Sequence, residues 1–293
     1  MRMNLELSIL RVLFLILVFP VSLIFEGLRR KLIARMQNRI GPPIWQPFYD
    51  VAKLLKKEEM NSLASENILF KILPILTLIS SFLLFFFIPF TIFSFHMDFI
   101  LFLYIFILSG ALYTLAGFAS NSPFGQLGSM RDIVLMVCYE TIFVVSIFSF
   151  IVYSNVDSIG SLDQRFLVLR LPLASVCLFV VALLESRITP LDTIEATTEI
   201  MGGVETEYSG KYLALLNIAK YLKFTFFVFL LSKLLFGFSS LLLFSLSSLA
   251  VLFILVLSQA TTSRYSFDQT LNLLKVFVFI AVLEFVRIRF VVW

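Results

Sequence analysis

The sequence is poor in charge, cysteine and histidine. Charged residues make up 14% of its 293 residues, whereas hydrophobic residues make up 60%. A soluble domain keeps about a quarter of its residues charged, and a largely apolar exterior is stable where the surrounding solvent is lipid. The composition therefore indicates an integral membrane protein. Its basic residues lie between apolar stretches rather than in one patch, so membrane lipid is an expected partner and nucleic acid is not.

The few cysteine and histidine residues do not form a ligand cluster. Cys138 and Cys177 lie in separate apolar stretches, where packing is their expected role, and His96 lies in a short gap. Iron–sulfur clusters and zinc sites usually require several cysteine or histidine ligands close together. We therefore expect that this chain binds no metal and no other cofactor and holds no complete active site. Any redox centre would then belong to another subunit.

Eight apolar stretches are long enough to cross a bilayer, since a spanning helix needs about 20 mostly apolar residues. They are 8–28, 68–92, 98–118, 131–153, 166–185, 212–236, 240–259 and 269–288. The sequence predicts an all-α integral membrane protein with about eight transmembrane helices, forming a single membrane domain over 1–293. The first stretch is followed by no small-residue cleavage site, so we expect it to be a span and not a signal peptide.

Basic residues predict the orientation of these spans. The segment 29–67 carries eight lysines and arginines. The positive-inside rule therefore places the long loops 29–67 and 186–211 in the cytoplasm and both termini outside the cell membrane. Arg287 and Arg289, near the C-terminus, go against the rule. Arg165 and Arg170 also fall on the outer side.

The first long loop predicts a turn and a short amphipathic cytoplasmic helix. Gly41-Pro42-Pro43 breaks the preceding helix. Within 46–58, Phe48, Val51 and Leu55 share one face, as in a helix lying at the membrane surface.

Polar side chains before this turn suggest a docking surface. They are Arg35, Gln37 and Arg39. The alternative is that these charges set topology and have no further role.

Glu140 lies inside the fourth apolar stretch. A carboxylate at that depth is costly and usually marks an ion path. We expect it to carry protons. The alternative is a structural glutamate paired with a lysine of another helix.

The second long loop is rich in carboxylates. If 191–201 is helical, Asp192, Glu195 and Glu199 share one face. Close like charges disfavour full ionisation, so such groups can share and pass protons. The alternative is a solvated acidic loop.

Helix-borne charges complete the candidates. Lys223 could pair with a carboxylate inside the bundle, and Lys220 could extend toward the membrane surface. Glu284 could either extend to the surface or have a functional role.

These residues carry a resemblance to a known family. The matching stretches are 34–42, the Asn121-Ser122 segment leading to Tyr139-Glu140, 190–203, 207–210 and 264–269. In these motifs the chain resembles the subunit 1 family of respiratory complex I, whose members join the peripheral arm to the membrane arm. It also resembles the counterparts of that family in membrane-bound nickel–iron hydrogenases.

Departures from the complex I pattern favour the hydrogenase branch. The chain passes from Pro43 almost directly to Gln46, where complex I has a longer insert with glycine and proline. Complex I also has glutamates where Thr197 stands and near Lys220, and a residue is added between Arg187 and Pro190. The short loop resembles the hydrogenase branch, including archaeal relatives that reduce protons or sulfane sulfur, so quinone binding is not carried over.

The resemblance implies eight helices, of which the second to sixth form a unit similar to half of an antiporter-like subunit. It implies that 29–67 and 186–211 dock a peripheral arm of iron–sulfur and hydrogenase-like subunits, which would hold iron–sulfur clusters or a nickel–iron centre. Antiporter-like membrane subunits would be further partners. The candidates for proton or ion coupling are Glu140, Glu185, Asp192, Glu195, Glu199, Glu205, Glu207 and Lys223. The candidates for docking or orienting are Arg35, Gln37, Arg39, Arg131, Arg187 and Arg264.

The function that follows is that of a non-redox subunit in an ion-translocating respiratory oxidoreductase. It would act as membrane anchor and ion-coupling subunit of a ferredoxin-driven, hydrogenase-type complex, and link electron transport to translocation of H⁺ or Na⁺. The alternatives are a quinone-chamber subunit of complex I, a subunit of a sulfane sulfur reductase complex, and a stand-alone secondary transporter.

Overall fold

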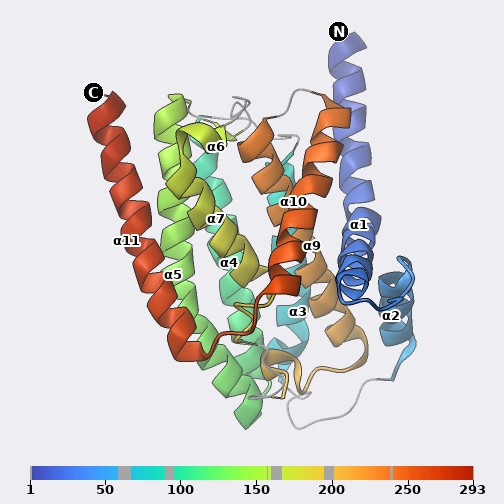
Figure 1. Cartoon of the computed structure of the whole chain (residues 1–293). Coiled ribbons are helices and arrows are strands. Elements are labelled where there is room, and N and C mark those ends of the chain that lie inside the picture. Colours follow the sequence, from blue (N-terminus) through green and yellow to red (C-terminus); the bar gives the residue numbers. More distant parts are fainter. Residues whose placement is uncertain are drawn as a thin grey trace.

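A computed structural model of the chain describes residues 2–58, 67–89, 96–156, 158–159, 167–194, 201–237 and 240–292, with the backbone alone for 2–12 and 291–292. Every regular element in these ranges is a helix. The long helices stand side by side as a bundle, and both termini lie at one end of it (Figure 1), which we call the terminal end. We call the opposite end, where the short helix α2 (Gln46–Lys56) lies, the loop end.

Each predicted apolar stretch contains helix where the structure describes it, although 68–92 is helical only to Phe86 and 166–185 is divided at Leu171. The helices are α1 (Arg2–Met36), α3 (Ile68–Leu83) with the 3₁₀ turn η2 (Leu84–Phe86), α4 (Asp98–Ala119), α5 (Pro123–Ser154), α6 (Leu167–Arg170), α7 (Pro172–Glu185), α9 (Gly210–Phe236), α10 (Leu241–Thr261) and α11 (Phe267–Val292). A second 3₁₀ turn, η4, covers Gly203–Glu205.

Five of these helices are long and apolar enough to cross a membrane, namely α3 with η2, α4, α5, α9 and α10. α7 is apolar but has only 14 residues, because Pro172 opens a new helix after α6. α1 and α11 are not among the five. The chain is thus an all-helical integral membrane protein by its apolar helices, and the number of eight spans stays a prediction.

Local signals set helix limits that hydropathy alone misplaces. α5 begins at Pro123 and not near residue 131, because the Ser122 side chain caps it by accepting a hydrogen bond from the Gly125 N–H at 3.0 Å. α1 continues to Met36, so the first part of the predicted loop is helical. α2 covers Gln46–Lys56, as the amphipathic pattern predicts, and it buries Pro47 and Val51 against the bundle while Leu55 is exposed.

Five helices form a closed ring. α3 contacts α4, α4 contacts α5, α5 contacts α7, α7 contacts α9, and α9 contacts α3. α1 and α10 pack on α9, and α11 packs on α5 and α7. Phenylalanines fill the interior, where the rings of Phe106 and Phe143 stack at 3.9 Å between centroids and both side chains are buried. α9 is the most enclosed of the five candidate spans.

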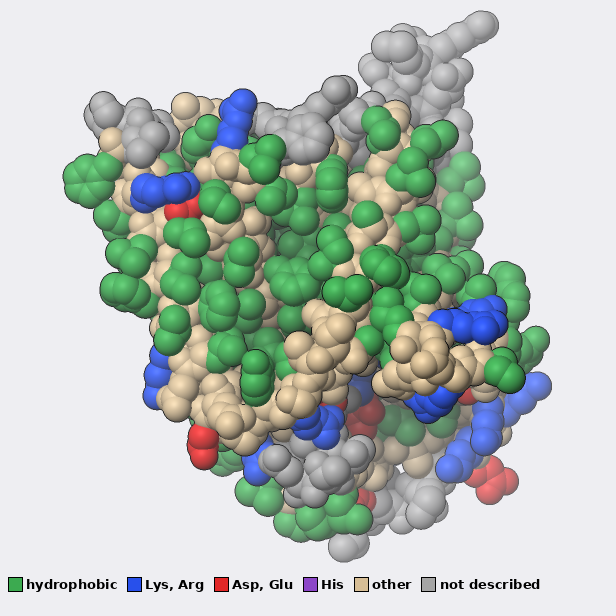
Figure 2. All heavy atoms as spheres, viewed as in Figure 1, with side chains coloured by type: hydrophobic (Ala, Val, Ile, Leu, Met, Phe, Trp, Pro, Cys, Tyr) green, Lys and Arg blue, Asp and Glu red, His purple; other side chains and the backbone are tan. Residues whose placement is uncertain are grey.

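The two ends of the bundle differ from its middle. Figure 2 shows hydrophobic side chains over the length of the helices on this face, while most acidic and basic side chains gather at the loop end. A smaller basic group lies at the terminal end. This distribution is what a lipid-exposed belt between two aqueous surfaces requires.

Candidate functional site

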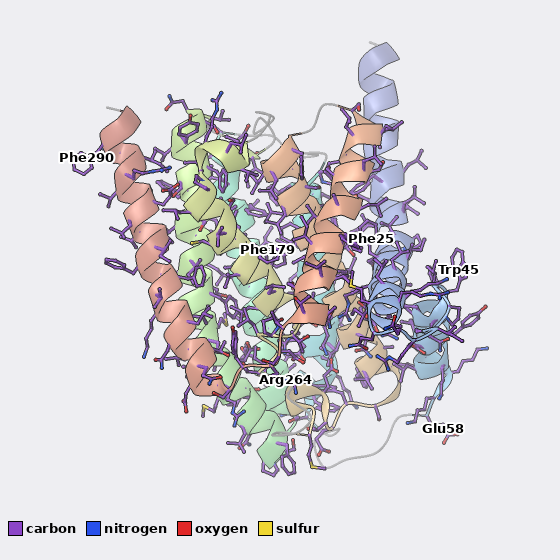
Figure 3. The ribbon with its side chains drawn as sticks, viewed as in Figure 1. Phe25, Trp45, Glu58, Phe179, Arg264 and Phe290 are labelled. Carbon is purple, nitrogen blue, oxygen red and sulfur yellow. The ribbon has the colours of Figure 1, made fainter. Side chains whose placement is uncertain are left out.

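The described candidate residues gather at the loop end or point into the bundle from it. Glu140 lies in the fifth turn of α5, Glu185 ends α7, and Lys223 lies in the fourth turn of α9. Arg264 lies where α10 leads into α11, at the loop end of the view in Figure 3. Glu195 and Glu199, two of the predicted coupling residues, lie outside the described residues.

A buried ion pair lies at the centre of the site. Lys223 donates a hydrogen bond from Nζ to Glu185 Oε1 at 2.5 Å, and less than a tenth of either side chain is exposed. The intramembrane pairing that the sequence allowed for Lys223 is therefore present. Glu140 interacts electrostatically with both residues. Its Oε1 atom is buried and has no hydrogen-bond partner among the described residues.

A second buried pair lies beside the first. Arg187 Nη2 donates to Asp132 Oδ2 at 3.1 Å, and both side chains are buried. The guanidinium also lies 3.7 Å from the centroid of the Tyr113 ring in α4. Arg187 itself has a positive φ of 52°, a backbone conformation that a non-glycine residue holds only where its surroundings enforce it. The Arg187 side chain is thus held between Asp132 and Tyr113, and its docking or orienting role stays a prediction.

The carboxylates of the two pairs belong to one electrostatic cluster. Asp132 interacts with Glu185 and Lys223 as well as with its partner Arg187, and Glu140 interacts with Asp132. We call Glu140, Glu185, Lys223, Asp132 and Arg187 the buried charge cluster. Sequence reasoning missed Asp132, although its position two helical turns before Glu140 could have indicated it.

Backbone contact fixes the loop beside this cluster. A Cβ added to Gly128 in α5 would lie 2.8 Å from the Cα atom of Gly203, and one added to Gly203 would lie 2.6 Å from the Ile194 carbonyl oxygen. Gly203 has a φ of 59°, which glycine adopts without strain. Tyr208 closes the same region, donating from its hydroxyl to the Ala116 carbonyl at 2.9 Å. The second long loop therefore packs directly on α4 and α5.

Two further pairs lie nearer the surface. Arg264 donates to Asp192 Oδ2 at 2.5 Å, and Lys220 lies 2.6 Å from Glu205 Oε1. The Tyr265 N–H also donates to the Pro190 carbonyl at 3.0 Å. The bonds of Arg264 and Tyr265 join the α10–α11 connection to the loop after α7, and the Lys220 pair joins α9 to η4.

The expected helix over 191–201 is not seen where the structure describes it. Residues 191–194 have irregular backbone, and 195–200 lie outside the described residues. The proposed common face of Asp192, Glu195 and Glu199 is therefore untested. Glu207 is exposed.

A further ionic group, in the C-terminal third of α1, was not predicted. Glu26 is 2% exposed and accepts hydrogen bonds from both Arg29 and Arg30 at 2.6 to 2.8 Å. Arg30 also donates to Asp50 in α2 at 2.7 Å and to the Tyr221 hydroxyl at 2.9 Å. A glutamate three and four residues before two arginines is a helix-pairing signal that could have revealed it.

The remaining docking candidates lie at the loop-end surface. Arg35, Gln37 and Arg39 are exposed, and Arg39 donates to Gln37. Arg131 lies 5.5 Å from the Phe267 ring centroid. These side chains are accessible to a partner, unlike the buried charge cluster.

A cavity opens beside the first loop. It has a volume of about 420 Å³ and is lined by Arg29, Arg30, Ile33, Ala34, Arg39, Gly41, Pro42 and Gln259. No group of histidine, cysteine and acidic residues suited to a metal ion is present in the described ranges. All of these residues except Gln259 belong to the segment 29–42, where a quinone-chamber function, one of the alternatives, would require an opening.

Comparison with known proteins identifies the family. The model of the family described as NADH dehydrogenase matches residues 9–289. The chain belongs to the NADH dehydrogenase family. The family resemblance inferred from the motifs is thereby confirmed.

Named members of the NADH dehydrogenase family match over most of their length. The chain is 32% identical to NADH-ubiquinone oxidoreductase chain 1 of Artemia franciscana, covering 84% of this chain and 85% of the relative. It is 31% identical to chain 1 of Aedes aegypti, covering 92% and 91%. It is 30% identical to a subunit of the NADH-quinone oxidoreductase of Helicobacter acinonychis, covering 78% of each. These relatives are individual chains or subunits of oxidoreductases.

A solved structure shares the fold of this member of the NADH dehydrogenase family. A chain of the membrane-bound sulfane sulfur reductase, an archaeal respiratory membrane complex, superimposes with a TM-score of 0.85. The match covers 96% of this chain and 99% of the other at 24% identity. At this identity the likeness establishes the fold and does not by itself assign the reaction.

Proposed function

We propose that this chain is the membrane anchor and ion-coupling subunit of a multisubunit respiratory oxidoreductase of the ferredoxin-driven, membrane-bound hydrogenase type. Its eight helices would span the cell membrane with both termini outside and the loop end in the cytoplasm. Partner subunits of the peripheral arm would hold the iron–sulfur clusters and the nickel–iron centre. Antiporter-like membrane subunits would receive the coupled signal. The chain itself would transfer no electrons.

The observation that carries this proposal is the buried charge cluster. Five ionisable side chains from α5, α7, α9 and the loop after α7 interact within the bundle. Buried charges are costly and are retained in membrane helices chiefly where ions or protons move. Since burial disfavours the ionised form and neighbouring cations restore it, a small change in local charge can move a proton between such groups.

The proposed coupling runs from the loop end inward. Electron transfer in a docked partner changes the charge next to the second long loop, which bears Asp192 and Arg187. Arg187 pairs with Asp132, whose charge acts on Glu185 and Glu140. A shift in this balance alters the proton occupancy of Glu140 and so starts translocation of H⁺ or Na⁺. The interaction between these charges is strong because their apolar surroundings screen it only weakly.

The decisive experiment replaces Glu140 by Gln in the assembled complex. We expect the variant to assemble and to transfer electrons in its soluble arm but to lose ion pumping in sealed vesicles. Asp268→Asn is the matched control, because Asp268 is an exposed carboxylate in the first turn of α11, outside the two loops expected to dock the peripheral arm. Pumping by Glu140→Gln at the rate of this control would refute the assignment.

A quinone-chamber function is the second candidate, and one observation favours it. The 420 Å³ cavity lies in the Arg29 to Pro42 region, beside the amphipathic helix α2 at the membrane surface. The relatives are named ubiquinone and quinone oxidoreductases. If this candidate is correct, activity of the purified complex will depend on added quinone and will fall when Ala34 is replaced by Trp, which would fill the cavity.

The co-purifying subunits separate the remaining candidate functions. A partner with the cysteine ligands of a nickel site would support the hydrogenase type, and a partner that lacks part of that set would support sulfane sulfur reduction. A free monomer with ion-exchange activity would support a stand-alone secondary transporter. We expect a complex, because the loop end exposes cations such as Arg35 and Arg39 next to buried charge.

A further inference from the structure

A second cavity lies at the terminal end, away from the buried charge cluster. Its volume is about 280 Å³, and its lining residues are Tyr153, Arg170, Leu171, Arg287 and Ile288. They come from the last turn of α5, from the junction of α6 and α7, and from the C-terminal part of α11. Spanning helices end near the membrane surface, where lipid headgroups lie, and this cavity lies among helix ends.

The two arginines of this cavity are among the residues that go against the positive-inside rule. Topology therefore gives no reason for their presence on this side. Arg170 and Arg287 give the cavity lining a positive net charge, and this charge stays positive when Glu284, the partner of Arg287, is counted with them. Two arginines that line a cavity of this size indicate an anionic ligand.

Glu284 fixes the position of one arginine. Its side chain is fully buried, and its Oε1 atom accepts a hydrogen bond from Arg287 Nη2 at 2.8 Å. The same nitrogen donates to the Arg170 carbonyl at 3.2 Å. Arg287 is thus tied to both α11 and α6, while nearly half of its side chain stays accessible. The Tyr153 hydroxyl adds a neutral donor, as tyrosines commonly do at membrane surfaces.

Large apolar side chains flank the arginines. Leu169 precedes Arg170 and is 80% exposed, and Phe290 is 82% exposed on the last turns of α11. Phe290 points away from the bundle in Figure 3. The two lining arginines thus lie close in the chain to apolar side chains on the outside of the bundle, so a ligand with an anionic head and an apolar tail fits this surface better than a free ion.

We propose that this cavity binds the phosphodiester headgroup of a membrane phospholipid, with the phosphate between Arg170 and Arg287. The acyl chains lie along Leu169, Phe290 and the adjoining helices. Guanidinium groups bind phosphate oxygens through charge-assisted hydrogen bonds. The bound lipid joins α5, α6 and α11 at the outer surface. This inference does not depend on the proposed coupling function.

The test uses the complete complex purified in detergent and stripped of loosely bound lipid. Native mass spectrometry counts the retained phospholipids, and the melting temperature is followed as phosphatidylglycerol is added back. The variant is Arg170→Gln with Glu284→Gln and Arg287→Gln, so that no buried carboxylate loses its cation. Arg289→Gln is the matched control, because Arg289 lies on the same helix but does not line the cavity.

The expected result is one phospholipid fewer in the variant and phosphatidylglycerol binding at least about tenfold weaker, since each charge-assisted contact contributes about that factor. The control should bind as the unmodified complex does. Equal lipid retention and equal affinity in the triple variant and the control would overturn the proposal. A rise in melting temperature with inorganic phosphate equal to that with phosphatidylglycerol would also overturn it, because the site would then bind a free anion.

Discussion

Lys223 Nζ lies 2.5 Å from Glu185 Oε1, although the two residues are 38 positions apart and come from α9 and α7. Both side chains are buried. Such a pair is weak evidence of net stabilisation, because each charge was removed from water to form it. Removal of one partner is a different matter, since it leaves the other charge buried and alone.

We therefore expect Lys223→Met to destabilise the chain by about 3–5 kcal/mol. The double variant Lys223→Met with Glu185→Gln should recover most of this loss, because Glu185 is then no longer a buried carboxylate without its cation. Thermal melting of the purified complex measures both effects. Lys275→Met is the control, as Lys275 is exposed on α11. A single variant that melts with this control would show that the pair is not buried in the assembled complex.

Arg187 provides a test of geometry at constant charge. Arg187→Lys keeps the cation but loses the planar contact with Tyr113 and the fit to Asp132, which a lysine does not reproduce. A desolvated contact of a cation with an aromatic face is worth about 2 kcal/mol, so we expect a loss of that order in stability. Arg131→Lys, whose guanidinium lies 5.5 Å from the Phe267 ring centroid, should cost less. Melting curves of the two variants measure this difference. Equal losses of stability in Arg187→Lys and Arg131→Lys would contradict the prediction.

Hydropathy located the helices of this chain but not all their ends. An apolar stretch of about 20 residues is easy to recognise in a sequence, because lipid requires apolar side chains along the whole length of a spanning helix. The start of α5 depends instead on one serine and one proline, Ser122 and Pro123, and α1 continues through the charged residues that were assigned to a loop.

The candidate site was predictable in part. Glu140 and Lys223 are both conspicuous in the sequence, because each is a charged residue within an apolar stretch. Their partners are not, because pairing across α5, α7 and α9 depends on how the helices are rotated, which one sequence does not specify. The Tyr113 ring beneath Arg187 and the contact between Gly128 and Gly203 are of this kind. Each is a long-range contact with no local signal.

The glycine contact predicts a steric effect. Gly128→Ala would place a methyl group 2.8 Å from the Gly203 Cα atom, where backbone on both sides leaves no flexible atom to move. Overpacking of this kind costs about 1–3 kcal/mol, which outweighs the gain of about 1 kcal/mol from alanine in a helix. Limited proteolysis should then cut the chain more rapidly around 201–209.

Gly110→Ala is the comparison for that experiment. A Cβ there would meet the Glu140 Oε1 atom at 3.3 Å, which is the end of a flexible side chain. We expect its stability to stay close to that of the unmodified chain. Cleavage around 201–209 at the same rate in both variants would mean that the Gly128 contact does not hold the loop.

Tyr208 predicts sensitivity to alkali. Burial raises the pKa of Tyr208 above its ordinary value of 10.0, whereas the unfolded chain would ionise near that value. The folded form therefore holds a proton that the unfolded form releases, so stability contributed by this group is present below pH 10 and is lost as the pH rises above it.

Tyr208→Phe should show a smaller loss of melting temperature between pH 9 and pH 11 than the unmodified chain, within the range set by a tyrosine of pKa about 10. At neutral pH the variant should be about 1 kcal/mol less stable, because the hydrogen bond to the Ala116 carbonyl is lost. Tyr49→Phe, at an exposed position on α2, is the control. Identical alkaline profiles for Tyr208→Phe and the unmodified chain would contradict the prediction.

The bond from the Tyr265 N–H to the Pro190 carbonyl has a practical consequence. An amide that is hydrogen-bonded exchanges with solvent deuterium only when the bond opens. Tyr265 lies outside the acidic loop, between α10 and α11, yet its exchange rate depends on whether that loop is in place. The deuterium exchange rate of this single amide therefore reports how often the loop opens. It can be measured in a complex at rest and again during turnover, without a label in the loop itself.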